Sequence, residues 1–107
     1  MEEAIYCLDE SLEIQPDNVE ALRNKGVALN TLGKYFEALN SYNQALSFEP
    51  NNHLTWYNKG NTFIDLEQYS EAINCYNKAL EILPSFELAR QNRETLLTWY
   101  PSLRQIK

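Results

Sequence analysis

A 34-residue repeat is the feature that most constrains the fold of this chain. When residues 17–50 are aligned with residues 51–84, fourteen of the 34 positions are identical. Pro16, Pro50 and Pro84 mark the same period. A repeat of this length is one supersecondary unit that cannot bury its apolar face alone and therefore stacks on copies of itself. The sequence thus predicts a repeat architecture.

Each repeat contains two helical patterns. Apolar and small residues recur on one face of a 3.6-residue period in residues 18–31 and again in residues 35–48. Residues 2–14 carry one further stripe, formed by Ala4, Ile5, Leu8 and Leu12. The segment from Ser85 begins like another first helix and breaks off at residues 99–101. We therefore predict six helices, with residues 101–107 as a loose or short helical tail.

Local signals predict how these helices begin and meet. Each proline is followed by cap-type residues, namely Asp17-Asn18, Asn51-Asn52 and Ser85. Asp17, followed three residues later by Glu20, also resembles a capping box. Gly26 and Gly60 lie inside helices, where each costs about 1 kcal/mol relative to alanine. We expect these glycines to face Ala38 and Ala72 of the partner helices, so that the two helices approach closely.

The turn between the two helices of a repeat differs between the copies. Gly33-Lys34 fits a helix C-terminus followed by a tight turn. Glu67-Gln68 stands at the same place in the next repeat, so that turn must form without glycine.

The repeat resembles the tetratricopeptide repeat (TPR), a 34-residue unit with a pattern of Trp, Leu-Gly, Tyr, Ala, Phe and Pro. The residues that match or substitute it are Leu22, Gly26, Leu29, Ala38, Tyr42 and Pro50, and Trp56, Gly60, Phe63, Ala72, Tyr76 and Pro84. The resemblance implies an all-α solenoid of antiparallel helix pairs in a right-handed superhelix. It also implies the boundaries 1–16 (second helix of a truncated repeat), 17–50 and 51–84 (full repeats), and 85–107 (capping helix and tail). We expect the chain to be a segment of a longer array.

In that family the first helix of each pair lines a concave groove that holds an extended peptide or a partner helix. The resemblance places the following residues in the groove: Arg23, Asn24, Val27, Asn30, Tyr57, Asn58, Asn61, Asp65, Gln91, Asn92 and Thr95. Three of them, Asn24, Asn58 and Asn92, are spaced by 34 residues and form what we call the amide ladder. A carboxamide has both donors and an acceptor, so such a row can pair with successive peptide groups. Alternatively, these amides cap or bridge neighbouring helices.

Basic residues replace the Leu that precedes Gly in the family pattern. Lys25, Lys59 and Arg93 share this position. Either their alkyl stems pack while their charges reach water, or they form a short basic ladder for an acidic ligand.

Composition and charge exclude several classes of function. The net charge of −6 argues against nucleic-acid or anionic-membrane partners, and no apolar run could span a bilayer. The single histidine, three glycines and dispersed glutamates give no metal site, phosphate loop or general acid/base pair, so we expect no enzyme and no cofactor. Cys7 and Cys75 are expected to be free, partly buried thiols in the cytoplasm.

Three functions remain open: a protein-interaction scaffold that binds a peptide or partner helix, a structural spacer, and the appended TPR region of a larger enzyme such as a glycosyltransferase. We also expect possible self-association through the uncovered N-terminal helix, by way of Ile5, Leu8 and Leu12.

Overall fold

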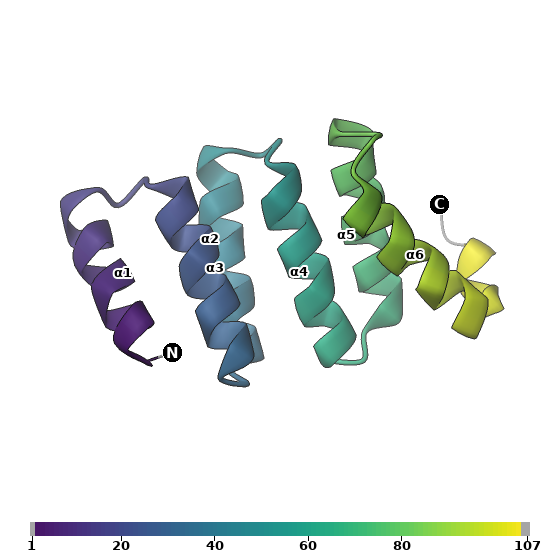
Figure 1. The fold of residues 1–107 in the computed structure, drawn as a ribbon, viewed down its shortest axis with the longest axis horizontal. Coiled ribbons are helices and arrows are strands. Elements are labelled where there is room, and N and C mark those ends of the chain that lie inside the picture. Colours follow the sequence, from purple (N-terminus) through teal and green to yellow (C-terminus); the bar gives the residue numbers. More distant parts are fainter. Residues whose placement is uncertain (1, 106–107) are drawn as a thin grey trace. The chain divides into compact units, whose positions relative to one another are not determined.

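The computed structural model describes residues 2–105, which contain six α-helices, one short 3₁₀ helix and no strand (Figure 1). The prediction of an all-α chain with six helices is therefore confirmed. Residues 106–107 of the predicted tail lie outside the described residues. The elements are α1 (Glu2–Ile14), α2 (Val19–Thr31), α3 (Tyr35–Phe48), α4 (His53–Asp65), α5 (Tyr69–Ile82), α6 (Glu87–Trp99) and η1 (Pro101–Gln105).

The chain divides into two compact units between Pro50 and Asn51. In the first unit, α2 packs along α3 and α1 packs on α2 (Figure 1). In the second unit, α4 packs along α5, α6 packs on α5, and η1 contacts both α6 and α5. Each unit is thus a helical hairpin joined by one further helix.

Asparagine caps the first helix of both hairpins. The Oδ1 atom of Asn18 accepts a hydrogen bond from the amide of Ala21 at 3.0 Å, and Oδ1 of Asn52 accepts one from the amide of Thr55 at 3.0 Å. The cap-type residues predicted at Asn18 and Asn52 are therefore confirmed. The capping box expected at Asp17 is wrong, because Asn18 occupies the extended position just before the helix. At α6 the cap position is held by Phe86, without a side-chain cap, so the expectation at Ser85 is also wrong.

The turns inside the two hairpins share one backbone geometry. Gly33 has a φ of 80°, and Glu67, its counterpart 34 residues later, has a φ of 59°. In both turns this residue and the next donate amide hydrogen bonds to the last helical turn, at 2.8–3.0 Å. Glycine adopts this left-handed region freely, whereas a residue with a Cβ does so at a cost of about 1 kcal/mol. The second turn therefore forms without glycine, but with a strained glutamate.

The helical glycines face tyrosine rings. A Cβ built on Gly26 would lie 2.3 Å from Cε1 of Tyr42, and one built on Gly60 would lie 2.7 Å from Cε1 of Tyr76. The nearest atoms all belong to the tyrosines, so the expected pairing with Ala38 and Ala72 is wrong. Each glycine makes room for a buried aromatic ring, which buries far more apolar surface than a methyl group.

Helix α1 turns its apolar stripe toward the rest of the first unit. Ile5 packs against the cluster of Leu29, Ala38 and Tyr42, and Leu12 packs against a second cluster of Val19, Leu22 and Ala45. Leu8 is half-buried. These side chains are therefore not the free face expected to mediate self-association. The exposed large apolar residues of α1 are Tyr6 and Ile14.

The two cysteines are both free but differ in environment. Cys75 is buried, as a small apolar residue of α5, whereas Cys7 is exposed, which corrects the expectation of two partly buried thiols. Burial raises the pKa of the Cys75 thiol to about 12, partly offset by the nearby charge of Lys59. Since the thiolate is the reactive form, Cys75 is protected by both its pKa and its burial.

We expect iodoacetamide at pH 8 to modify one thiol of the native chain rapidly, at Cys7. The second thiol should react at a comparable rate only after denaturation. Mass spectrometry of the modified peptides measures both rates, and Cys7→Ser serves as the control that removes the fast reaction. Equal modification of both thiols in the native chain would contradict the burial of Cys75.

Candidate functional site

The three basic residues at the shared repeat position all find intramolecular partners. Nζ of Lys25 lies 2.7 Å from Oδ1 of Asp9, and Nη1 of Arg93 donates to Oδ1 of Asn77 at 3.0 Å. Asp9 and Asn77 are themselves two repeat lengths apart. Nζ of Lys59 lies 5.0 Å from the centroid of the Trp56 ring. These contacts favour a packing role over a basic ladder for an acidic ligand.

A polar cluster joins the three helices of the second unit. It consists of Tyr57 and Asn61 from α4, Tyr76 from α5 and Asn92 from α6, and we call it the Asn92 cluster. The Tyr76 hydroxyl donates to Oδ1 of Asn61 at 2.5 Å. Nδ2 of Asn92 lies 3.1 Å from the same Oδ1 and 3.4 Å from the hydroxyl oxygens of both Tyr57 and Tyr76.

Burial keeps the centre of this cluster neutral. Tyr76 is fully buried, and desolvation raises the pKa of its hydroxyl well above the usual range, although the hydrogen bond from Asn92 acts in the opposite direction. The tyrosine therefore remains a hydrogen-bond donor at physiological pH. Aromatic contacts hold the neighbouring side chain: the Tyr57 ring lies 5.9 Å from Tyr76 and 5.2 Å from Phe86, between centroids.

The cluster fixes the orientation of the Asn92 carboxamide. Its Nδ2 carries two hydrogens, which it shares among the three acceptors, and Oδ1 takes part in none of these contacts. Because Asn61 Oδ1 already accepts from Tyr76, the group of Asn92 that faces it must be the donor. Oδ1 of Asn92 is thus a pre-oriented acceptor that could receive an N–H from a bound backbone.

A small cavity of about 190 Å³ adjoins the Asn92 cluster. Its lining comes from α4, the start of α5 and α6, and comprises Ile64, Tyr69, Asn92, Thr95, Leu96 and Trp99. The Trp99 side chain is 70% exposed. The Thr95 hydroxyl donates to the carbonyl of Gln91 at 2.9 Å, so the lining is mainly apolar apart from the Asn92 amide. Such a cavity suits one apolar side chain.

The sequence patterns did not predict most of this lining, namely Ile64, Tyr69, Leu96 and Trp99. One signal could have found Trp99: it follows Asn92 by seven residues and Thr95 by four, so all three lie on one helix face. The resemblance implied a capping role for the last helix, so Trp99 at its end was not predicted as a site residue.

The other predicted site residues are distributed between the two units. In the first unit, Arg23, Asn24 and Asn30 are half-buried and Val27 is 37% exposed. Asn24 lines a cavity of about 220 Å³ together with Leu8, Asn18, Glu20 and Ala21.

In the second unit, the structure brings together Tyr57, Asn61, Asn92 and Thr95. Asn58 is half-buried, and its carbonyl accepts a hydrogen bond from the Thr62 hydroxyl at 3.3 Å. Asp65 is exposed. Gln91 stays apart from the cluster, because its Nε2 donates to Oε1 of Glu87 on the same helix at 3.3 Å.

Residues 2–105 contain no helix with the length and apolarity needed to cross a membrane. In the same range, no three His, Cys, Asp or Glu side chains are grouped so that they could hold a metal ion.

The helices define an all-α solenoid of antiparallel helix pairs, a class of repeat scaffold. Family models described as tetratricopeptide repeat match residues 7–40 and 53–86, and one described as TPR repeat matches residues 28–65. The chain belongs to the tetratricopeptide repeat family. No curated protein matches the sequence.

Solved structures share the fold. The first TPR domain of human RPAP3 is 22% identical, with a TM-score of 0.89 over 99% of this chain and 84% of its own. The first TPR of Spaghetti (RPAP3) bound to the HSP90 peptide SRMEEVD is 23% identical, with a TM-score of 0.85 over 91% of this chain and 77% of its own. A mutant O-GlcNAc transferase of Thermobaculum terrenum is 28% identical, with a TM-score of 0.82 over 87% of this chain and 18% of its own.

Proposed function

We propose that the chain binds an extended peptide or a partner helix, and that in the second unit the contact is made by the Asn92 cluster and its adjoining cavity. The observation that carries this proposal is the fixed carboxamide of Asn92, whose Oδ1 is left to accept while its Nδ2 is held from three sides. An acceptor held in place loses little entropy on binding. The cavity beside it offers an apolar side-chain subsite.

The proposed contact surface follows the expected groove positions. In the first unit these are Arg23, Asn24, Val27 and Asn30, and in the second they are Tyr57, Asn58, Asn61, Asp65, Gln91, Asn92 and Thr95. The peptide bound to the first TPR of Spaghetti, a protein of the same fold, supports a peptide ligand. We assign this contact surface to the full repeats at residues 17–50 and 51–84 and to the capping helix within residues 85–107, with residues 1–16 as the second helix of a truncated repeat.

The test is a selection of peptides from a random displayed library on the wild-type chain, followed by affinity measurement on variants. Asn92→Ala should weaken binding about tenfold, because one well-oriented hydrogen bond is worth about 1.4 kcal/mol. Replacing the whole amide ladder, Asn24, Asn58 and Asn92, should abolish it. Trp99→Ala, at an exposed residue, should weaken binding without loss of stability.

The matched control is Asn40→Ala, which removes an exposed amide from α3. It should leave affinity unchanged. The melting temperature of each variant shows whether lost binding reflects lost folding. Undiminished affinity in both Asn92→Ala and Trp99→Ala would contradict the proposal.

A second function is the appended TPR region of a larger enzyme, without catalysis of its own. The likeness to 18% of the Thermobaculum terrenum O-GlcNAc transferase chain supports it. The reading frame that surrounds the segment distinguishes this function from a free-standing scaffold, since a catalytic domain would be encoded in the same frame.

Two further properties stay predictions. A cytoplasmic location is supported by the two unpaired cysteines. Association of two chains through α1 would have to use exposed residues such as Tyr6 in place of Ile5 and Leu12. Light scattering at high concentration tests it, and a monomer would rule it out.

A further inference from the structure

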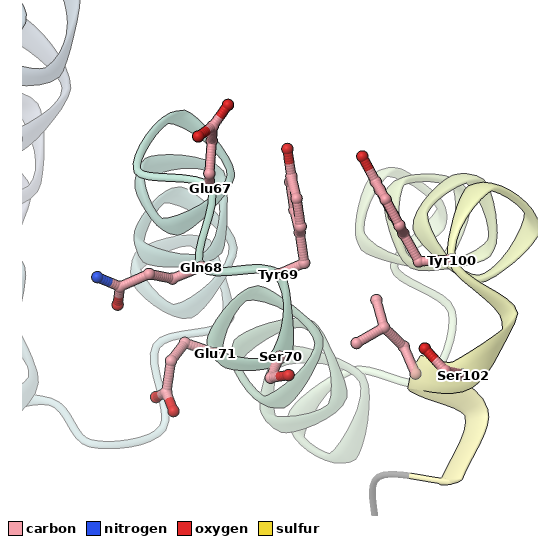
Figure 2. A pocket seen from close by; sticks show the side chains of 8 residues that line it. Glu67, Gln68, Tyr69, Ser70, Glu71, Tyr100 and Ser102 are labelled. Atoms are coloured by element: carbon pink, nitrogen blue, oxygen red, sulfur yellow. The ribbon is translucent and has the colours of Figure 1, made fainter.

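A third cavity, of about 420 Å³, lies where the α4–α5 turn meets the end of α6 and η1 (Figure 2). Its lining comprises Glu67, Gln68, Tyr69, Ser70, Glu71, Tyr100, Ser102 and Leu103. This volume falls within the range of small-ligand pockets. The lining contains two carboxylates and no lysine or arginine, so its charge selects for a cation.

Two aromatic rings form one wall of this cavity. The rings of Tyr69 and Tyr100 are stacked, with centroids 4.7 Å apart and planes inclined by 19°. Figure 2 shows Tyr100 on one side of the Tyr69 ring and the Glu67 side chain on the other. Because the two rings are stacked, the pair offers a ligand one flat aromatic face. It does not surround the ligand with several rings. A flat aromatic face beside a carboxylate is suited to a planar cation.

Glu67 lines this cavity with its backbone in a strained, left-handed conformation. Its left-handed φ of 59° is one that glycine adopts freely, and Gly33 does so in the first hairpin, with a φ of 80°. The first hairpin also has Lys34 and Phe36 where this cavity has Gln68 and Ser70. Tyr35 and Glu37 of the first hairpin correspond to Tyr69 and Glu71, so what distinguishes the second hairpin is Glu67 together with Tyr100.

No described base neutralises the cavity from within. Arg104 of η1 is not part of the lining, and its Nη2 lies 3.7 Å from Oε2 of Glu94 on α6. The carboxylates of Glu67 and Glu71 are both exposed, so they can be reached from solvent.

We propose that this cavity binds the guanidinium group of an arginine side chain from a partner protein. The guanidinium stacks on the face of the Tyr69 ring that is turned away from Tyr100 and toward Glu67. It donates hydrogen bonds to the Glu67 carboxylate. Arginine fits better than lysine, because its planar fork can stack and donate at the same time, whereas an ammonium is a compact, strongly hydrated point charge. This cavity shares Tyr69 with the cavity beside the Asn92 cluster, but Glu67 lines only the arginine site. A change at Glu67 therefore tests this site apart from the proposed peptide contact.

The test uses three capped tripeptides, Gly-Arg-Gly, Gly-Lys-Gly and Gly-citrulline-Gly, titrated into the isotope-labelled chain and followed by amide NMR. The arginine peptide should shift the amide resonances of residues 67–71, 100, 102 and 103 with a dissociation constant of about 1 mM. The lysine peptide should bind about fivefold more weakly, and the neutral citrulline peptide should not bind. No shift with arginine, or equal affinity for arginine and lysine, would overturn the proposal.

Glu67→Gly separates binding from folding. It removes the carboxylate and supplies the residue that the turn geometry favours, so arginine binding should weaken at least fivefold while the melting temperature rises by about 4 °C. Tyr69→Leu should also weaken binding, by removing the stacking face. Glu37→Gln, at the position of the first hairpin equivalent to Glu71, is the matched control and should change nothing. Arginine binding that survives Glu67→Gly would overturn the assignment.

Discussion

Replacing Gly26 with alanine is expected to lower the free energy of unfolding by about 2 kcal/mol, although alanine is the better helix former. Relief of the glycine penalty would stabilise the helix by about 1 kcal/mol. The new methyl group, however, would lie 2.3 Å from the ring of Tyr42, which is 1% exposed and packed against Leu29 and Ala38. Overpacking of this kind costs up to about 3 kcal/mol. The steric term exceeds the helical one, so the melting temperature should fall by about 10 °C.

Two further variants show whether the ring is the cause. Gly60→Ala should be less harmful than Gly26→Ala, because its methyl group would meet Tyr76 at 2.7 Å. Tyr42→Leu should relieve part of the cost when combined with Gly26→Ala, and a double-mutant cycle measures that coupling. Thermal or urea unfolding gives the free energies. A melting temperature that rises in Gly26→Ala would show that helix propensity decides this position.

Replacing Tyr76 with alanine is expected to cost about 4 kcal/mol, a large fraction of the 5–15 kcal/mol that stabilises an ordinary domain. The ring is fully buried in the core cluster of the second unit, which contains Ile73 and Leu96. Its loss would leave a cavity between α4, α5 and α6 and would also remove the hydroxyl that donates to Asn61. Denaturant unfolding monitored by circular dichroism measures the change.

Tyr76→Phe separates the ring from the hydroxyl. It keeps the packing and should cost about 1 kcal/mol, the net contribution of one hydrogen bond. The raised pKa of Tyr76 also sets a pH dependence: the native state favours the neutral phenol, so this stabilisation is complete below pH 10, the usual pKa, and is lost as the pH rises above it. The wild-type chain should therefore lose more stability than Tyr76→Phe between pH 9 and pH 12. Equal slopes for the two proteins would contradict a buried neutral hydroxyl.

The helices could be predicted from the sequence because each pattern occurs more than once. The predicted ranges 2–14 and 35–48 coincide with α1 and α3, since a 3.6-residue period repeated at the same register leaves little choice of boundary. Contacts between helices were harder to predict, because they depend on which side chain fills a given space. Gly26 was expected to meet Ala38, but spacing along a helix does not show that a ring from the next turn fills the gap.

The candidate site could be predicted only in part. Family positions identified Tyr57, Asn61 and Asn92, but not that they meet through Tyr76, because that contact depends on three helices at once. The acidic cavity was not foreseen either. It requires a glutamate in a left-handed turn and a chain that returns after α6 to place Tyr100 against Tyr69. Neither feature has a period that a repeat alignment would reveal.

Asp9 and Asn77 stand at equivalent repeat positions, but one is charged and the other is neutral. The helices they hold should therefore respond differently to salt. Helix α1, which has no buried residue, is held to α2 partly by an ion pair between Lys25 and Asp9, whereas Arg93 of α6 meets the uncharged amide of Asn77 on α5. The Lys25 and Asp9 side chains are 29% and 49% exposed, so dissolved salt screens their attraction in part, and it affects a hydrogen bond to a neutral oxygen less. Rising ionic strength should therefore weaken the contact of α1 with α2 before it weakens the contact of α6 with α5. The salt concentration thus determines which terminal helix frays first.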